Sequence, residues 1–472
     1  MAEEEVMARA PEGVMASTAI GKQAVVIGAG MGGLAAAGAL AGHFEAVVVL
    51  ERDALPTEPK HRAGTPQSRH VHGLQASGQR ALDELFPDFA RDLVQSGAVP
   101  HKLGLEILIE RPGYDPFPAR DLGFTNYSAS RPTIEYTLRQ RVESLANTTV
   151  RERCRVRELV TSPDGARISG VRYENADGAS ETMPADLVVD ASGRGALTLA
   201  LLRSIGRPQP DETTIGIDIA YSTCVFEWPD HVPCDWKGVM HFGRVPEDKR
   251  GALMFQIEGD RWMVTLNGRH GVVPPGDADG FLAYARELRT PTIYNAIKDA
   301  KRATGVARHA FPDSVHRHFE RLAFFPRGLL PIADAICQFN PVYGQGMSVA
   351  AQEACLLRRL LDKLTRERDP LAELAPAFFA EAQGLIETPW AAAMQDFAFP
   401  QTRGRRPPDF EATLKFGSAL VRLAAEDPAV HRLMSEVINL LKPRSVYRDP
   451  ALKQRITALM ESQSDALMTW SR

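Results

Sequence analysis

Residues 21–33, with the sequence GKQAVVIGAGMGG, constrain the fold of this chain more than any other stretch. An apolar, β-rich run leads directly into Gly28, Gly30 and Gly33, and an alanine-rich stretch that predicts a helix follows them. In this order the first glycine permits a tight turn, the second lets the backbone approach a pyrophosphate, and the third lets the helix pack on the strand. The sequence therefore predicts a dinucleotide-binding unit whose helix N-terminus faces the phosphates.

A second apolar run, AVVVLERD, extends this unit and contains Glu51 and Arg52. Glu51 lies about twenty residues beyond the glycines, where an acidic side chain accepts hydrogen bonds from the ribose hydroxyls of a bound dinucleotide. This pattern is shared by NAD and FAD sites, so at this point the nucleotide remains open.

Length and charge limit the other classes of function. A chain of 472 residues has room for two or three domains, or for one large two-lobed domain. Its net charge of -4 argues against non-specific binding to nucleic acid or to anionic membranes, which requires a basic excess. The apolar residues 24–42 approach the length of a membrane span, but the dinucleotide unit already accounts for them, so we expect no transmembrane segment.

The cysteines and the N-terminus bear on metals and location. The five cysteines, Cys154, Cys224, Cys234, Cys337 and Cys355, form no C-x-x-C pair and have no histidine at a ligand spacing. We therefore expect neither a metal site nor disulfide bonds, and a reducing, cytoplasmic location. Residues 1–22 begin with acidic side chains, lack the basic region of a signal peptide, and are predicted to be a flexible tail.

Along the rest of the chain, a β-rich middle interrupts the nucleotide-binding domain. Alternating strands begin near residue 150, short strands continue from residue 215 to 266, and the last hundred residues read as amphipathic helices. We predict an α/β fold in which residues 23–100, 127–210 and 322–365 form a discontinuous Rossmann-like domain. Residues 101–126 and 211–321 would form a β-sheet substrate domain, and residues 366–472 a C-terminal helical region.

Three motifs in order resemble the FAD-dependent monooxygenases of the hydroxylase type. They are VVIGAGMGG with VVVLERD, then ADLVVDASGR, and then GLLPIADAICQFNPVYGQGMSVAAQEA. The loop GTPQSRHVHGLQASGQRALDELFP and the stretch SRPTIEYTLRQRV look most like the bacterial branch that contains polyether epoxidases, which is distantly similar to squalene epoxidase. The resemblance covers residues 24 to about 456 and implies an FAD-binding domain of the hydroxylase type.

The resemblance also implies roles for residues of the second and third motifs. Asp190 and Gly193 would lie near the FAD pyrophosphate, and Asp334 would bind the ribityl or ribose-phosphate region. The loop beside the isoalloxazine ring would contain Pro341, Gly344, Gln345 and Gly346, with a helix starting near Met347. Such a helix points its positive end at the ring, where it would stabilise an anionic reduced flavin. Two positions depart from the family, since Ala333 and Ala191 stand where glycine is usual.

Further candidates come from basic and polar side chains. By analogy with the family, Arg131 and Arg139 would meet the FAD phosphates or the flavin edge, although arginines on a helix are also typical of a solvated face. Gln67, Arg69, His70 and His72 belong to a long loop that the resemblance places beside the flavin. Such a loop is often functional; a histidine here is a candidate general acid or a structural residue, and we predict no catalytic side chain.

The implied reaction is monooxygenation in secondary metabolism. Reduced FAD and O₂ would give a flavin C4a-hydroperoxide, which passes one oxygen atom to an alkene (epoxidation) or to a ring (hydroxylation). Apolar residues of the middle sheet suggest a lipophilic substrate: Phe226, Met240, Phe242, Met254 and Phe255. NADH or NADPH is the expected reductant, with a separate flavin reductase as the alternative.

Three other functions remain open for this fold. A flavin-dependent halogenase would usually carry W-x-W-x-I-P, and the nearest stretch here, DRWMVTLNG, lacks it. A flavin-dependent double-bond reductase would share the lipophilic pocket. A non-catalytic lipid carrier would need no flavin, but the residues around Asp334 favour a bound cofactor.

Overall fold

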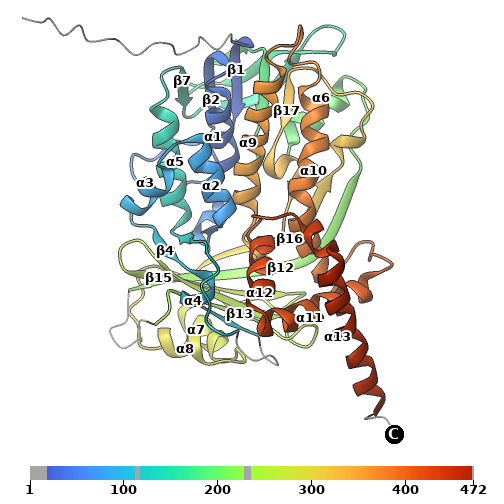
Figure 1. The fold of residues 1–472 in the computed structure, drawn as a ribbon. Helices are drawn as coiled ribbons and strands as arrows, with labels where there is room; N and C mark the ends of the chain where they lie inside the picture. Colours follow the sequence, from blue (N-terminus) through green and yellow to red (C-terminus); the bar gives the residue numbers. More distant parts are fainter. Residues whose placement is uncertain (1–18, 112–116, 228–234, 470–472) are drawn as a thin grey trace, which may run out of the picture.

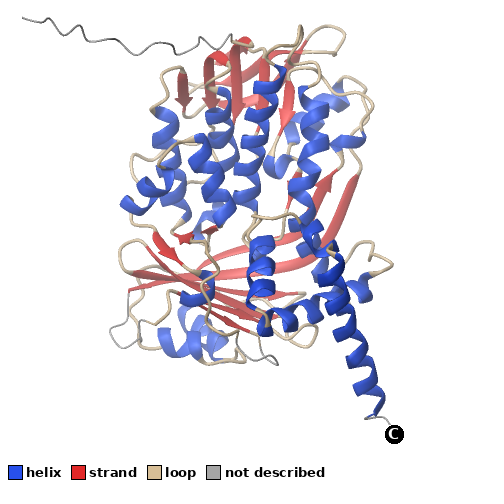
Figure 2. Ribbon diagram, in the orientation of Figure 1, coloured by secondary structure: helices blue, strands red, loops and turns tan. Residues whose placement is uncertain are grey.

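The structure is a computed structural model that describes residues 19–111, 117–227 and 235–469. Most of the predicted tail, residues 1–18, lies outside the described residues. Figures 1 and 2 show a helix-covered parallel sheet in the upper half of the view and a large, curved sheet in the lower half. The residues of the candidate site lie on strands of these two sheets and on the segments that connect them.

The upper sheet has five strands, all parallel, in the order β17-β11-β1-β2-β7. The strands are β1 (Gly21–Ile27), β2 (Phe44–Leu50), β7 (Thr148–Arg151), β11 (Leu187–Asp190) and β17 (Leu329–Pro331). The last four residues of β1 and of β2 are all apolar and buried because both faces of the sheet are covered there. Alternate residues divide between the two sides, with Val26 in the core beneath the helices and Val25 in the core on the other face.

Helices cover one face of this sheet, and a small antiparallel sheet lies over the other. The helices are α1 (Met31–Leu40), α2 (Ala76–Leu85), α3 (Phe89–Gln95), α5 (Arg131–Glu143), α9 (Gly346–Leu364) and α10 (Leu374–Ala393). The opposite face carries α6 (Ala196–Ser204) and the strands β8 (Arg155–Thr161), β9 (Ile168–Glu174) and β10 (Ser180–Pro184). This is the layered arrangement expected of a doubly covered parallel sheet.

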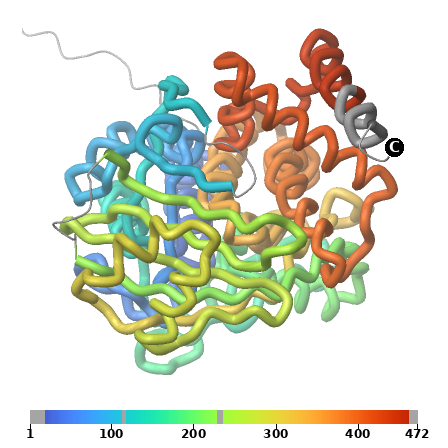
Figure 3. The backbone as a smooth tube through the Cα atoms, turned by 90° about the horizontal axis from the view of Figure 1, so that it is seen from below, coloured from blue at the N-terminus to red at the C-terminus, as the bar shows by residue number. Residues whose placement is uncertain are grey.

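The lower sheet has seven strands in the order β18-β16-β12-β15-β14-β13-β5. They are β5 (Ile107–Glu110), β12 (Glu212–Glu227), β13 (Gly238–Phe242), β14 (Arg250–Ile257), β15 (Arg261–Arg269), β16 (Ala307–Arg317) and β18 (Cys337–Gln338). Figure 3 views this sheet from below, with the C-terminal helices to one side of it. β18 lies inside the segment predicted to be nucleotide-binding, so the chain joins both lobes within a few residues of Asp334.

Helices pack on the outer face of the lower sheet, and its inner face looks toward the parallel sheet and the C-terminal helices. α7 (Ala278–Arg286) and α8 (Thr292–Ile297) bury Phe226, Met254 and Trp262 on the outer face. The C-terminal helices are α11 (Phe410–Glu426), α12 (Pro428–Ile438) and α13 (Pro450–Thr469). Because side chains alternate along a strand, the neighbours of Met254 in β14 face inward.

Short elements complete the described chain. They are α4 (Leu103–Glu106), the sheet of β3 (Gly73–Leu74), β6 (Asn126–Ser128) and β4 (Val99–His101), and the 3₁₀ turns η1 (Pro66–Arg69), η2 (Phe319–Arg321), η3 (Ala333–Ala335), η4 (Pro341–Tyr343), η5 (Met394–Ala398) and η6 (Arg444–Arg448). Among the described helices, none combines the length and the apolar character needed to cross a membrane.

Candidate functional site

A cavity opens at the carboxyl ends of four parallel strands. Its walls come from the residues that follow β1, β2, β11 and β17, together with the first residues of α5 and α9. The predicted residues on these walls are Gly28, Gly30, Glu51, Arg52, Gln67, Arg131, Gly193, Asp334, Gly346 and Met347. In open α/β sheets, ligands bind in the crevice outside the carboxyl ends of the strands, so we call this the nucleotide cavity.

The three glycines of the first motif serve different purposes. Gly28 has φ of +100°, which favours glycine, and it makes the turn after β1. A Cβ on Gly33 would lie 1.9 Å from the carbonyl oxygen of Gly28, so this residue permits the helix to pack on the strand. A Cβ on Gly30 would meet only Arg131 Nη2, at 3.9 Å. Gly30 therefore faces open space in the cavity, whereas Gly33 lies at the contact between helix and strand, as expected of the third glycine.

Glu51 holds the glycine loop in place while it lines the cavity. The backbone N–H of Ala29 donates to Glu51 Oε2 (2.8 Å), and the N–H of Asp53 donates to Oε1 (3.0 Å). Arg62 completes this arrangement, because its Nη1 lies 3.2 Å from Glu51 Oε2 and 3.0 Å from Asp53 Oδ2. The glycine loop is thus anchored by a carboxylate that is 4% exposed.

Arg62 is a site residue that the sequence analysis missed. Its Nε also donates to Glu135 on α5 (2.8 Å), and its side chain is 6% exposed. Burial works against the charge, but Glu135 and Glu51 together raise the pKa of Arg62 above its usual value. Only the fold brings these residues together, because Glu135 lies far along the chain.

Arg131 and Asp334 both line the cavity, although they come from segments that are far apart in the chain. Arg131 is the first residue of α5, after the N-cap Ser130, and its Nη2 donates to Glu135 Oε2 (3.1 Å). The Arg131 Nε is buried and has no hydrogen-bond partner among the described residues. Burial raises the pKa of Asp334, which Arg131 and Arg317 oppose, and no described side chain or N–H donates a hydrogen bond to its carboxylate. Both side chains therefore have unused hydrogen-bonding capacity for a ligand.

Asp190, which was predicted to lie near the FAD pyrophosphate, does not itself line this cavity, although the residues directly after it do. It is fully buried, and its oxygens accept four hydrogen bonds, two from Ser192 (3.1 and 2.6 Å) and two from Thr198 (3.2 and 2.7 Å). These bonds shape the loop after β11 and the start of α6. Asp190 thereby presents Gly193, which has φ of +102° and open space around its Cα, to the cavity.

A second, apolar cavity lies between the inner face of the lower sheet and α12. It has a volume of about 230 Å³ and is lined by Met240, Phe242 and Phe255 among others. Phe226 and Met254, which the sequence analysis grouped with them, instead pack beneath α7 and α8, so only part of the predicted lipophilic set faces a pocket. We call this space the apolar cavity.

Two loops contribute residues to both cavities. In one loop Arg62, Gly64, Thr65 and Gln67 line the nucleotide cavity, and Val71, Gly73, Leu74 and Gln75 line the apolar cavity. In the other, Pro341, Val342, Tyr343 and Gly344 line the apolar cavity, and Gly346 and Met347 line the nucleotide cavity. Gln345 lines neither; its Nε2 donates to the carbonyl of Ile438 (3.0 Å) and ties this loop to α12. We call the region of these two loops the junction of the two cavities.

The histidines near this junction are neutral at physiological pH. His70 Nδ1 forms a hydrogen bond with Thr223 Oγ1 (2.7 Å), and burial lowers the pKa of His70 to about 4. Burial likewise lowers the pKa of His72 to about 3. Neither imidazole carries a proton to donate as a charged general acid. Arg139 is also outside the nucleotide cavity, because its guanidinium donates to the carbonyl of Pro56 and lies against the ring of Tyr136.

Comparison with known proteins identifies relatives over most of the chain. No family model matches it. Protein Rv3254 of Mycobacterium tuberculosis is 37% identical over 361 residues, which is 72% of this chain and 72% of that protein. The chain belongs to the family of Protein Rv3254. Squalene monooxygenase 1,1 of Brassica napus is 23% identical over 75% of this chain, which spans 66% of that protein. Squalene epoxidase 3 of Arabidopsis thaliana is 23% identical over 77% of this chain, and the match covers 65% of that protein.

Solved structures share the fold at low sequence identity. The flavin-dependent brominase Bmp2 is 14% identical with a TM-score of 0.64, and the match covers 94% of this chain and all of that one. PqsL, a probable FAD-dependent monooxygenase from Pseudomonas aeruginosa, is 16% identical with a TM-score of 0.57, over 80% of this chain and 98% of its own. The flavin-dependent halogenase CmlS is 20% identical with a TM-score of 0.62, over 85% and 71% of the two chains. These matches confirm the predicted fold class.

Proposed function

We propose that this protein is an FAD-dependent monooxygenase that transfers one oxygen atom from O₂ to a lipophilic small molecule. The observation that supports this best is the junction of the two cavities. One cavity has the strand ends, glycines and charged side chains that suit a dinucleotide, and the other is apolar, and the same two loops line both. A flavin ring at that junction would face an apolar substrate directly.

The residues of the nucleotide cavity fit FAD. Gly30 leaves room for the pyrophosphate to approach the backbone, and the guanidinium of Arg131 lies close enough to the glycine loop to offset phosphate charge. Glu51 and Arg52 suit the ribose, and Gln67 and Gly193 contribute to the remaining wall. Asp334, whose carboxylate accepts no hydrogen bond from the described residues, suits the ribityl hydroxyls. Bound and reduced, FAD would supply the activation of O₂.

The chain itself would provide orientation, charge and exclusion of water. The N-terminus of α9, at Gly346, would place unpaired N–H groups and a positive dipole end near the ring, where they stabilise negative charge. Pro341 and Gly344 would present backbone rather than bulky side chains to the ring. Because the histidines of the junction are neutral, we assign no catalytic side chain.

We propose that the substrate is oxidised by alkene epoxidation or ring hydroxylation in secondary metabolism, as in the polyether epoxidase branch. The similarity to plant squalene monooxygenases supports the alkene. We further propose a cytoplasmic protein that takes electrons from NADH or NADPH, or from a separate flavin reductase.

The test begins with an absorption spectrum of the purified protein, anaerobic reduction with NADH or NADPH, and addition of ¹⁸O₂ with a lipophilic polyene or aromatic compound. We expect bound flavin and a product that gains one ¹⁸O atom. Flavin that neither nucleotide reduces points to a partner reductase, which is then added. A colourless protein that does not bind added FAD refutes the proposal and leaves the lipid carrier.

The same assay separates the rival flavoenzymes. A halogenase, favoured by the structural similarity to Bmp2 and CmlS, would need bromide or chloride and would give a halogenated product. A double-bond reductase would give a saturated product without ¹⁸O. Either outcome contradicts monooxygenation while leaving the FAD site in place.

A further inference from the structure

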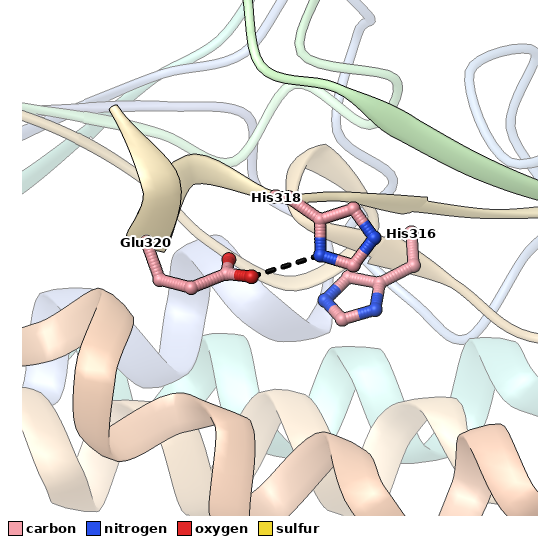
Figure 4. Close-up of side chains that lie close together, drawn as sticks. All are labelled: His316, His318 and Glu320. Atoms are coloured by element: carbon pink, nitrogen blue, oxygen red, sulfur yellow. Dashed lines mark hydrogen bonds and ion pairs between the residues drawn. The ribbon is translucent and has the colours of Figure 1, made fainter. Parts of the chain in front are cut away.

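A compact group of two histidines and a glutamate lies outside both cavities. His316 is near the end of β16, His318 follows that strand, and Glu320 is in η2. Figure 4 shows the two imidazole rings next to each other, with the carboxylate of Glu320 beside them. One ligand atom from each residue lies within 4.8 Å of the other two. Histidine nitrogens and a carboxylate oxygen form a ligand set that suits transition metals.

The extended backbone explains why these side chains gather. Alternate residues of a strand point to the same side, so His316 and His318 share one side and Arg317 takes the other. Arg317 Nη1 donates to the carbonyl oxygens of Asp334 and Ala335 (3.2 Å each), at the wall of the nucleotide cavity. The histidines thus lie on the reverse of the segment that supports the Asp334 turn.

His316 has a ring nitrogen for which the described residues provide no hydrogen bond. Its Nε2 is buried without a hydrogen-bond partner, and the residue is only 6% exposed. Buried polar atoms are ordinarily hydrogen-bonded, and a metal ion is a partner that an imidazole nitrogen can bind.

The other two residues already have supporting contacts of the kind that metal ligands use. His318 Nε2 bonds Thr213 Oγ1 (2.7 Å), which leaves Nδ1 for a metal, and Gln383 Nε2 donates to Glu320 Oε2 (3.2 Å), which leaves Oε1. Such outer contacts orient the ligands of metal sites. Without a metal, His318 Nδ1 and Glu320 Oε1 bond each other (2.8 Å), so a cation would displace one proton.

We propose that His316, His318 and Glu320 bind a divalent transition-metal cation, with Zn²⁺ as the probe, that braces the end of β16. This revises our expectation from the cysteines that the chain has no metal ligands. Ligands about 2.1 Å from zinc in a tetrahedron lie about 3.4 Å apart, so the side chains must move slightly closer. Arg321 Nε is 3.5 Å from Glu320 Oε1, but this guanidinium is 59% exposed and can turn toward solvent. The cation has a structural role, because none of its ligands lines either cavity.

Calorimetric titration of the chelator-treated, flavin-loaded protein with ZnCl₂ tests this proposal. We expect one Zn²⁺ per chain. His316→Ala should weaken binding by about 100-fold or more, and Thr213→Val, which removes only an outer contact, by about tenfold. His43→Ala is the matched control, because His43 Nε2 lies 2.8 Å from Asp362 Oδ1 but belongs to no three-residue group among the described residues.

Thermal unfolding provides a second readout. Zn²⁺ should raise the melting temperature of the wild type and of His43→Ala, and leave that of His316→Ala unchanged, because a ligand stabilises only the state that binds it. If His316→Ala does not fold, the proposal is tested by the expected loss, about tenfold, of Zn²⁺ affinity in Thr213→Val. Absence of binding to the wild type, or equal binding by Thr213→Val and His43→Ala, would show that His318 and Glu320 are only an ion pair.

Discussion

Alanine at position 30 should weaken FAD binding and leave folding unchanged, whereas alanine at position 33 should destabilise the fold. At Gly30 the new Cβ meets only Arg131 Nη2, at 3.9 Å, and the backbone (φ -81°, ψ -177°) accepts alanine without strain. Gly30→Ala should therefore leave the apoprotein folded and intrude only on a bound pyrophosphate. At Gly33 the Cβ would lie 1.9 Å from Gly28 O and 3.3 Å from Val26 Cγ1, so Gly33→Ala should disturb the fold itself.

The structure sets the size of both effects. Overfilling a packed site by one methyl group costs about 1–3 kcal/mol. Since about 1.4 kcal/mol is tenfold in affinity, Gly30→Ala should weaken FAD binding by roughly 5-fold to 150-fold. The Gly33→Ala clash is with backbone, which cannot turn aside, so its loss of folding stability should be at the upper end, about 3 kcal/mol.

The assay combines FAD titration, followed by flavin fluorescence, with urea unfolding of each apoprotein. We expect Gly30→Ala to match the wild type in urea and to differ in FAD affinity, and Gly33→Ala to unfold at lower urea. If Gly30→Ala binds FAD as tightly as the wild type does, the pyrophosphate does not lie at this glycine and the proposed cofactor site is wrong.

Three other variants test the site. Arg62→Met removes the cation that Glu51, Asp53 and Glu135 share and should lower the free energy of unfolding by about 3 kcal/mol in urea titration; an unchanged midpoint would contradict the buried network. Met240→Trp should fill the apolar cavity and reduce substrate turnover by about tenfold or more, while flavin absorbance stays unchanged; normal turnover would place the substrate elsewhere. Burial raises the pKa of Glu353 from 4.5 to about 7, so between these values the folded chain retains a proton that the unfolded chain has lost, and stability falls as the pH rises. Glu353→Gln should flatten this decline between pH 5 and 8 in urea unfolding, and parallel profiles would refute it.

The parts of the site that follow from local sequence were predictable. Gly28, Gly30 and Glu51 depend on a strand, a tight turn and a helix that are consecutive in the chain, and each of these has its own pattern. Asp334, Gly346 and Met347 were reached through motif resemblance, and they line the same cavity as Gly28 and Gly30. The pattern at Asp190 was also local, but its hydrogen bonds to Thr198 show that it shapes the loop instead of lining the cavity.

The rest depends on contacts between distant segments. Nothing near Arg62 indicates that Glu135 will lie 2.8 Å from its Nε, because α5 approaches this loop only in the folded chain. Alternation in β14 predicts that Met254 and Phe255 face opposite sides. It does not tell which side is covered by α7 and α8 and which faces a cavity. The sequence analysis therefore grouped both residues in one pocket.

The turn that carries Asp334 is held from both sides before any cofactor binds. Ala333 has φ of +54°, a left-handed conformation that alanine adopts at a cost of about 1 kcal/mol, and glycine is usual here in the wider family. Its N–H donates to Glu353 on α9 (2.6 Å), and Arg317 on β16 bonds the carbonyl oxygens of the next two residues. These bonds offset the strain that alanine introduces and limit the motion of the turn. Since groups that are already ordered lose less entropy on binding, the departure from glycine favours a preformed site for Asp334 to meet the ribityl chain.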